Sequence, residues 1–520
     1  MKEFIKETIR RLKSNNKKSI PNNNSNLPEK STPKSKMKIN SKGDMRPQIS
    51  IREVCSILEL PLPDNSTIDI DKKRNVSTTT WAMKEEGIAF AWKKYGIDAT
   101  YAQKKHASMI LDEVLHENTG AYSAKYPNGM ETGHAFAKVC KYIRDQYDIP
   151  AIAITGNAGK TTTKDLIGSV FCQTKDTLCV LKNYNTLYVM GEVIQNLTED
   201  HEFYIQEIHE PQGRICSEVL SPDAVVFTNL ERAHLNETGG ASLEASIKST
   251  LKIMDFMKKD GVVFANNNCP YLANEKFEGR KVIRYGTESS NNDYWAENIV
   301  NHGQNTTFTI CSKQDKPINV VLHIAGIHNV GNAVGAYAVG RYYGIDPKDI
   351  VEGLESYYPD GVRQNLVKLN DRYALIDCYS STILSSVAAV KTLCELPLKE
   401  GAKRIAVLSY LPTLDKGSET VHRDVGKRIA QMPVDKVIAY RNDAKFIVDE
   451  CVKVGKDAIF FQYHKDIIEY LKDNLDKDDN IVFKGVTFAH LEQIANSALG
   501  LNIIPENSLE MDRSRNGGDF

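Results

Sequence analysis

No stretch of about 18 consecutive apolar residues occurs in this 520-residue sequence, and a membrane-spanning helix needs roughly that length. The first residues also lack the apolar core that secretion signals carry. The chain also lacks an excess of either charge, because its 66 lysines and arginines nearly balance its 67 aspartates and glutamates, and the net charge is −1. That balance argues against a dedicated nucleic-acid binder. The sequence therefore predicts a protein with no transmembrane segment and no nucleic-acid partner.

Closely spaced cysteines are absent as well. The chain has 10 cysteines, none of them in C-x-x-C or C-x-H spacing, so neither a zinc site nor a disulfide framework is indicated. Their scatter is typical of buried thiols in a reducing compartment. We expect a cytoplasmic protein in which cysteine supplies no metal site.

What the chain does contain is typical of a globular protein, with 41% apolar and 26% charged residues. Its length predicts about three domains. Residues 1–48 stand apart, because Asn, Ser, Lys and Pro dominate them and too few apolar residues remain for folding alone. The expected organisation is a disordered basic tail, three domains and a flexible tail, with boundaries at 1–48, 49–148, 149–340, 341–505 and 506–520.

The segment MKEFIKETIRRLKS at the start of this tail predicts a short basic helix, with Ile5, Ile9 and Leu12 on one face. Such a helix could contact an anionic membrane surface or a partner protein. A solvated tail is the simpler interpretation, and we favour it.

Apolar runs alternate with helical stretches through the rest of the chain. A small α/β domain is expected at 49–148, where GIAFAW predicts a strand and FAKVCKYIRDQY a helix. In 149–340 the runs AIAIT, TLCVL, FYIQEI, AVVFTNL and GVVFANN predict strands, and in 341–505 YALIDCY, RIAVLSYL, KVIAY, AIFFQY and NIVFKGV do. This alternation predicts an α/β fold with a doubly wound, mainly parallel central sheet and a second, Rossmann-like α/β unit.

Residues 149–164, IPAIAITGNAGKTTTK, combine an apolar strand, a glycine loop and the start of a helix. Loop N–H groups and the positive helix end can hold a polyphosphate, Lys160 can reach its β- and γ-phosphates, and the Thr161 hydroxyl can hold Mg²⁺. Ile154 replaces the first glycine of the ordinary P-loop, so this loop is a shorter form. A glycine-rich turn that binds nothing would not explain a lysine where the helix dipole disfavours cations. The segment predicts a nucleotide site formed by Thr155, Gly156, Asn157, Ala158, Gly159, Lys160, Thr161 and Thr162.

Polar residues follow the apolar runs that come next. Glu207 ends FYIQE, and a carboxylate there could hold Mg²⁺ together with Thr161, although a surface glutamate is the alternative. His234 follows AVVFTNL, but a lone histidine is more often structural than a ligand. Asn183 and Asn185 by themselves indicate only a turn.

Several motifs in a fixed order resemble the Mur ligases, the ATP-dependent amide-forming enzymes of peptidoglycan assembly. They are TGNAGKTTT, NYN, Glu207, TNLERAHL, Lys248 fourteen residues after His234, AGIHNVGNAVGAYAVG, GVRQN, ALIDCYS, HRDVG and FKG. The resemblance covers most of residues 50–500 and implies the three-domain Mur ligase architecture, with a UDP-type substrate domain, a central ATP-binding domain and a C-terminal ligase domain. LIDCYSSTILSSVAAVKTL, VLSYLPTLDKGSETVHRDVG and VFKGVT look most like the branch that adds D-alanyl-D-alanine to a UDP-N-acetylmuramoyl tripeptide.

The resemblance also implies roles for individual residues around ATP and two Mg²⁺ ions. Thr161 and Glu207 would hold one ion, and His234 would help to hold a second. Lys248 falls where the family has a carbamylated lysine, an anion that can support a metal ion, although the sequence alone would make it an ordinary surface lysine. The residues that would lie near the adenine or close over the nucleotide are His328, Asn329, Asn332, Arg363 and Asp377.

The implied reaction activates a carboxylate. The carboxylate attacks the γ-phosphate of ATP and gives an acyl phosphate and ADP, and an amine then attacks the acyl carbon and releases phosphate. Lys160 and Mg²⁺ would offset charge on the transferring phosphoryl group, so Lys160, His234 and Lys248 are the expected catalytic residues. Domain closure would exclude water, which hydrolyses acyl phosphates.

The substrate side departs from the family pattern. VSTTTWAMKEEGIAFAW lacks the Asp and Arg of the family's S-T-D-S-R segment, and residues 379–382 read YSST in place of Y-N-A-N. SYLPTLD replaces GDMLELG, and Ile327 replaces the arginine of GRHN. Such changes alter what a buried site accepts. Two alternatives therefore stay open: a Mur-type ligase with a non-peptidoglycan carboxylate and amine, and a nucleotide-binding scaffold without catalysis.

Overall fold

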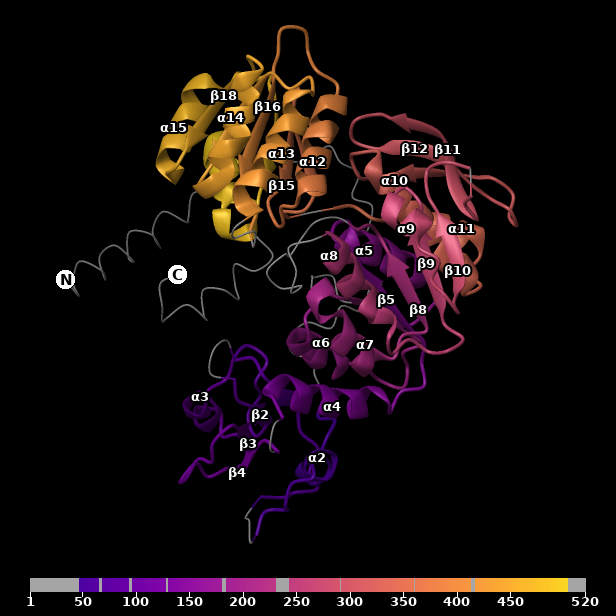
Figure 1. The fold of residues 1–520 in the computed structure, drawn as a ribbon, viewed down its shortest axis with the longest axis vertical. Coiled ribbons are helices and arrows are strands. Elements are labelled where there is room, and N and C mark those ends of the chain that lie inside the picture. Colours follow the sequence, from indigo (N-terminus) through magenta and orange to yellow (C-terminus); the bar gives the residue numbers. More distant parts are fainter. Residues whose placement is uncertain are drawn as a thin grey trace, which may run out of the picture. The chain divides into compact units, whose positions relative to one another are not determined.

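The structure, a computed structural model, describes residues 46–64, 68–92, 96–127, 130–179, 184–230, 243–289, 291–359, 361–412 and 417–503. Their strands form three sheets, of four, nine and six strands, and helices flank each of the two larger sheets (Figure 1). Most pairings are parallel, so the predicted α/β class with a mainly parallel central sheet is confirmed. Among the described residues, no helix combines the length and the apolar character needed to cross a membrane.

The first sheet is entirely parallel, in the order β1-β2-β3-β4. A capping box between Ser50 and Glu53 begins the helix before it, and that helix buries one apolar face. The strands and helices of this part are β1 (Val76–Ser77), β2 (Ile88–Phe90), β3 (Met109–Asp112), β4 (Tyr122–Lys125), α2 (Ile51–Leu58), α3 (Ala99–Lys104) and α4 (Thr132–Arg144).

The central sheet has the order β13-β12-β11-β10-β9-β8-β5-β7-β6. It is parallel from β6 to β11 and ends in the antiparallel strands β11, β12 and β13. The strands are β5 (Ala151–Thr155), β6 (Thr177–Cys179), β7 (Phe203–Glu207), β8 (Ala224–Phe227), β9 (Val262–Asn266), β10 (Lys281–Tyr285), β11 (Tyr294–Asn301), β12 (Thr306–Ser312) and β13 (Ile318–Leu322). The predicted strands β5 to β9 are present, whereas the antiparallel extension was not anticipated.

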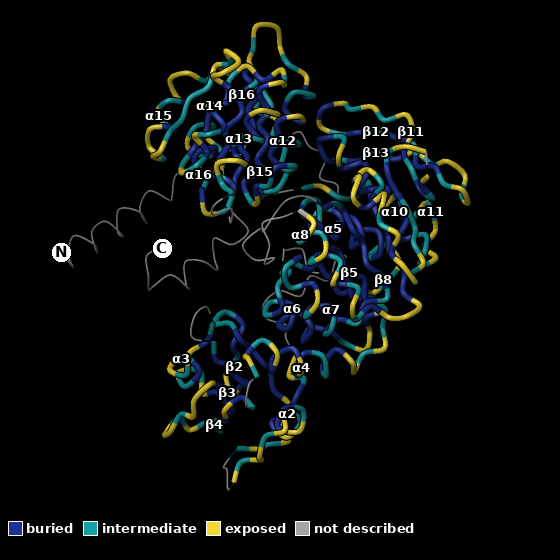
Figure 2. The backbone as a smooth tube through the Cα atoms, in the orientation of Figure 1, coloured by how far each residue is buried: buried dark blue, intermediate teal, exposed yellow. Residues whose placement is uncertain are grey.

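Alternate residues of β5 point into two different hydrophobic cores, which is why the strand is buried throughout (Figure 2). Ile152 and Ile154 pack with α5, α10 and α11, whereas Ala151 and Ala153 share a core with α4, α6 and α7. α10 is buried on nearly all sides, as expected of a helix without a polar face. The helices are α5 (Lys160–Phe171), α6 (Leu187–Ile194), α7 (Gly213–Leu220), α8 (Leu243–Leu251), α9 (Pro270–Asn274), α10 (His328–Tyr342) and α11 (Pro347–Glu355), with 3₁₀ turns η3 (Glu210–Gln212) and η4 (Lys252–Met254).

The last sheet has the order β14-β15-β19-β16-β17-β18, and only β14 is antiparallel. Helices α12, α13 and α14 share one core with it, and α15 and α16 another. Its elements are β14 (Asn365–Leu369), β15 (Arg372–Asp377), β16 (Arg404–Ser409), β17 (Lys436–Tyr440), β18 (Asp457–Phe461), β19 (Asn480–Lys484), α12 (Ile383–Glu395), α13 (Ser418–Ala430), α14 (Lys445–Lys453), α15 (His464–Asn474) and α16 (Leu491–Leu499), with 3₁₀ turns η6 (Asn442–Ala444) and η7 (Thr487–Ala489).

Candidate active site

The glycine loop lies between the end of β5 and the start of α5, as the sequence predicts. Gly156 has a φ of 133°, and a Cβ atom there would come within 2.2 Å of the Thr228 hydroxyl, so only glycine fits. Asn229 holds the loop from the end of β8: its Oδ1 accepts from the Ala158 N–H at 2.9 Å and its Nδ2 donates to the Ala158 carbonyl at 2.8 Å. The loop is therefore fixed in an open cradle by the residues that follow the neighbouring strand.

Lys160 turns back toward the loop. Its Nζ donates to the Gly156 carbonyl at 2.6 Å and pairs with Glu210 Oε1 at 2.9 Å. Glu210 is almost completely buried, with 1% of its side chain exposed, and its Oε1 also accepts from Asn157 Nδ2 at 3.3 Å. The sequence reasoning did not single out Glu210, which comes three residues after the strand-end Glu207.

Thr161 and Glu207 meet as the sequence suggests, with 2.7 Å between the hydroxyl and the carboxylate Oε2. Asn185 Nδ2 donates to the other carboxylate oxygen at 2.9 Å. Both Thr161 and Glu207 are buried and line the same cavity as the glycine loop. A hydroxyl and a carboxylate at this spacing are ligands that Mg²⁺ accepts beside phosphate oxygens, so the donors present fit the implied ion.

The start of α10 supplies a second polar group. Asn329 Nδ2 donates to Gln364 Oε1 at 2.7 Å, and Asn332 Nδ2 donates to Asn329 Oδ1 at 3.1 Å. His328 is exposed at the start of α10, and of these residues His328 and Asn332 line the cavity.

The last sheet contributes a cation–carboxylate pair from the ends of two neighbouring strands. Lys484, at the end of β19, pairs with Asp377, at the end of β15, at 2.8 Å, and both are buried. Arg363 Nη1 donates to the Thr161 hydroxyl at 3.3 Å, and its guanidinium stacks on Tyr379 at 3.3 Å from the ring centroid. Residues of the last domain thus reach the phosphate-binding helix.

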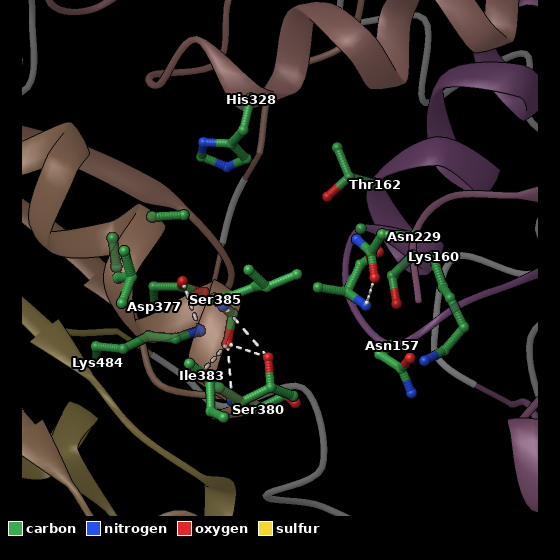
Figure 3. Close-up of a pocket in the computed structure, with 18 of the residues that line it drawn as sticks. Asn157, Lys160, Thr162, Asn229, His328, Asp377, Ser380, Ile383, Ser385 and Lys484 are labelled. Atoms are coloured by element: carbon green, nitrogen blue, oxygen red, sulfur yellow. Dashed lines mark hydrogen bonds and ion pairs between the residues drawn. The ribbon is translucent and has the colours of Figure 1, made fainter. Parts of the chain in front are cut away.

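A single cavity of about 1080 Å³ joins these groups. Figure 3 shows Lys160 and Thr162 on α5, Asn229 after β8, Asp377, Ser380, Ser385 and Lys484 in the last domain, and His328 on α10, all of which line this cavity. This volume lies at the upper end of the range of small-molecule sites, roughly 300 to 1,000 Å³. The arrangement can hold a polyphosphate beside a second reactant.

Lys248 is a predicted residue that the described part of the chain does not bring to this cavity. Lys248 lies on α8 with an exposed side chain and is not among the residues that line the cavity. His234 and Asn183 lie outside the described residues.

The predicted UDP-type segment takes its partners from the central domain, on and just before α6. The Ser77 hydroxyl donates to Glu192 Oε1 at 2.7 Å and the Thr79 hydroxyl at 2.9 Å. Trp81 stacks on Tyr184 with 5.6 Å between ring centroids. Where the family pattern has Asp and Arg, this chain therefore has a hydroxyl bound to a buried glutamate and an indole stacked on a tyrosine.

Comparison with known proteins decides what this site belongs to. Residues 154–340 match the model of the Mur ligase middle domain, and residues 362–487 match that of the Mur ligase, glutamate ligase domain. A relative from Bacillus subtilis (strain 168), UDP-N-acetylmuramoyl-tripeptide–D-alanyl-D-alanine ligase, is 30% identical over 371 residues, which is 70% of this chain and 79% of the relative. The chain belongs to the Mur ligase family.

Other relatives and solved structures agree with this Mur ligase assignment. The enzyme of the same name from Haemophilus influenzae is 27% identical over 419 residues, 77% of this chain and 87% of its own. The crystal structure of MurF from Acinetobacter baumannii has a TM-score of 0.76 at 21% identity and covers 88% of this chain and 100% of its own. MurF from Thermotoga maritima, solved in complex with ADP, has a TM-score of 0.70 at 19% identity over 82% and 97% of the two chains. The three-domain Mur ligase fold is thereby confirmed, and this Mur ligase is an ATP-dependent, ADP-forming ligase.

Proposed function

We propose that this Mur ligase joins the carboxylate of a UDP-N-acetylmuramoyl peptide to the amine of D-alanyl-D-alanine, in the cytoplasm, as a step of peptidoglycan precursor synthesis. The observation that carries the proposal is the single cavity between the phosphate loop, with Lys160 and Thr161, and the Asp377–Lys484 pair of the last domain. The relatives that carry the name of this activity support the choice of substrates. All partners are then small molecules.

Different residues of the chain bind the phosphates and hold the metal ion in the proposed reaction. Loop N–H groups and Lys160 bind the β- and γ-phosphates, and Arg363 approaches the same oxygens from the last domain. Bound Mg²⁺ would draw charge from the transferring phosphoryl group, and Thr161 and Glu207 would hold one such ion. The substrate carboxylate attacks the γ-phosphate, the bond to the bridging β-phosphate oxygen breaks, and an acyl phosphate and ADP form. The amine then attacks the acyl carbon, and phosphate leaves.

A second Mg²⁺ ion and a carbamylated lysine belong to the same proposal. His234 would help to hold the second ion, and a carbamate on Lys248 would support it from α8. The resemblance of TNLERAHL and the spacing from His234 to Lys248 support this assignment. His328, Asn329 and Asn332 would lie near the adenine, and Arg363 and Asp377 would close over the nucleotide.

A second candidate keeps the reaction but changes the substrates. The Glu192 bonds to Ser77 and Thr79 and the Trp81–Tyr184 stack use side chains at the positions where the family contacts its uridine nucleotide. The serines and the threonine at 380–382 likewise change the side chains at the positions where the family places its incoming amine. These features favour a ligase of this family with a different carboxylate and amine. A nucleotide-binding scaffold is the remaining alternative, and the intact phosphate loop argues against it.

The test is ATP-dependent product formation with UDP-N-acetylmuramoyl-tripeptide and D-alanyl-D-alanine, read by mass spectrometry beside a Lys160→Ala control. A product heavier by the dipeptide minus water, absent from the control, supports the cell-wall ligase. Folded protein that binds Mg-ATP but forms no product rejects these substrates and points to the second candidate. A folded Lys160→Ala variant that still performs the protein's role in the cell points to a nucleotide-binding scaffold without catalysis.

A further inference from the structure

We propose that Glu210 is an internal counter-anion that occupies the phosphate-binding ammonium of Lys160 and that the nucleotide has to displace. The inference rests on the nucleotide site proposed above. It adds a residue that sets the affinity of that site for the β- and γ-phosphates.

The carboxylate of Glu210 sits among groups that belong to the phosphate cradle. Lys160 Nζ lies 2.9 Å from its Oε1, and Asn157 Nδ2 donates to the same oxygen at 3.3 Å. His209 Nδ1 lies 3.2 Å from the other oxygen, Oε2. Only 1% of the Glu210 side chain and 12% of the Lys160 side chain are exposed, so little water screens the pair.

Lys160 has only three N–H donors to distribute. The Gly156 carbonyl takes one at 2.6 Å and Glu210 takes another at 2.9 Å. A nucleotide whose β- and γ-phosphates enter the loop needs the same ammonium, and it brings further negative charge close to a buried carboxylate. Only one N–H of Lys160 is left for the two phosphates, so their binding weakens or breaks the Lys160–Glu210 pair, and the lost interaction reduces the affinity for the polyphosphate.

Glu210 cannot easily move away, because the backbone around it is held in place. It opens η3, the 3₁₀ turn that leads directly into α7. The His209 N–H donates to the Asn185 carbonyl at 2.8 Å, and Gln212 Oε1 accepts from the Leu187 N–H at 2.7 Å. The residues on both sides of Glu210 are thus tied to the segment before α6, and Lys160, with its long flexible side chain, is the partner that moves.

The decisive variant is Glu210→Gln, which keeps an acceptor for Asn157 and removes the charge. We expect it to bind Mg-ADP and Mg-ATP about 3- to 30-fold more tightly than the wild type by titration calorimetry, since the ammonium becomes free for phosphate. AMP carries no β-phosphate, so its affinity should not change. In steady-state assays KM for ATP should fall by a larger factor than kcat changes.

Glu202→Gln is the matched control, because Glu202 pairs with Lys175 at 2.8 Å on the surface and should leave all three affinities unchanged. Unchanged or weaker Mg-ADP binding by a folded Glu210→Gln protein would overturn the proposal, as would an equal gain for AMP. Glu210→Asp, which keeps the charge and shortens its reach, should give an intermediate gain and replaces the Gln variant if that variant does not fold. A wild type that binds no nucleotide would instead reject the proposed function.

Discussion

Glu192 shows how a single residue can make the stability of this Mur ligase depend on pH. The carboxylate is fully buried on α6 and accepts hydrogen bonds from Ser77, Thr78 and Thr79. Burial raises the pKa of Glu192 from its ordinary 4.5 to about 7, although the hydroxyl and N–H donors oppose that rise. The folded protein therefore binds this proton more tightly than the unfolded chain does.

A carboxyl whose pKa is raised in the folded state stabilises the fold fully below its unfolded pKa and loses that contribution as the pH rises through the folded pKa. For Glu192 the window runs from pH 4.5 to about 7, and the loss amounts to about 3 kcal/mol at pH 8. We expect Glu192→Gln to reduce this fall, measured as the free energy of unfolding in urea at pH 5 and pH 8. An equally steep fall in Glu192→Gln and in the surface variant Glu202→Gln would contradict this assignment.

Lys248 carries a second prediction at the scale of one residue. If its amine forms a carbamate that supports a metal ion, Lys248→Ala should lose most of its ligase activity, and added formate or acetate should restore part of it. Lys252, in the next helical turn, offers a neighbouring lysine for comparison, and Lys252→Ala should keep its activity. A fully active Lys248→Ala enzyme would rule the carbamate out.

At the scale of the elements, glycines set how closely α11 approaches the phosphate-binding helix α5. A Cβ atom at Gly353 would lie 2.6 Å from the Val170 Cα atom and 2.8 Å from the Ser169 carbonyl oxygen. At Gly340 of α10 the nearest atoms, from Val170 and Ile350, lie at 3.0 Å. Both helices therefore press on the C-terminal turn of the helix whose first residues bind phosphate.

Gly353→Ala should accordingly destabilise the fold by about 1–3 kcal/mol, because backbone atoms cannot give way as side chains do. Gly213→Ala is the control: it sits in a helical conformation, and the nearest atom to its Cβ position is 3.5 Å away. That control should be neutral or stabilising by up to about 1 kcal/mol. Urea unfolding of both variants gives the comparison, and equal free energies would show that α11 can move without cost.

At the scale of the whole molecule, residues 46–49 are bonded to the parts of the chain that follow them. The Arg46 N–H donates to the Gln195 carbonyl at 3.2 Å, and Gln48 Nε2 donates to the carbonyls of Gln195 and Leu197. Ile49 is completely buried. The segment that begins at residue 46 is therefore part of the fold.

Removal of residues 1–45 should leave kcat and KM in solution unchanged. Removal of residues 1–48 should lower the melting temperature, because it also deletes the bonds of Arg46 and Gln48 to the segment after α6. Steady-state assays and thermal unfolding of the two truncations, beside the full chain, check both expectations. A large loss of activity in the shorter truncation would show that the tail takes part in the site.

Much of the fold followed from local patterns. The runs that became β5, β7, β8 and β9 begin with at least three consecutive apolar residues, as is typical of strands covered on both faces, and the glycine loop is recognisable from its sequence. The sequence did not predict β11 to β13. These strands are partly exposed on one face, so polar residues interrupt their apolar runs. The relation of Thr161 to Glu207 was predictable, since neighbouring parallel strands end at one sheet edge.

The sequence by itself determined the phosphate loop, the alternating α/β order and the family, because each depends on residues that are close in the chain or on motifs in a fixed order. Only the tertiary structure decided that Glu210 pairs with Lys160, that Glu192 binds the hydroxyls of Ser77 and Thr79, and that Asp377 meets Lys484. These partners lie between 50 and 115 residues apart. A side-chain contact over such a separation is set by strand order and helix packing, which no local pattern encodes.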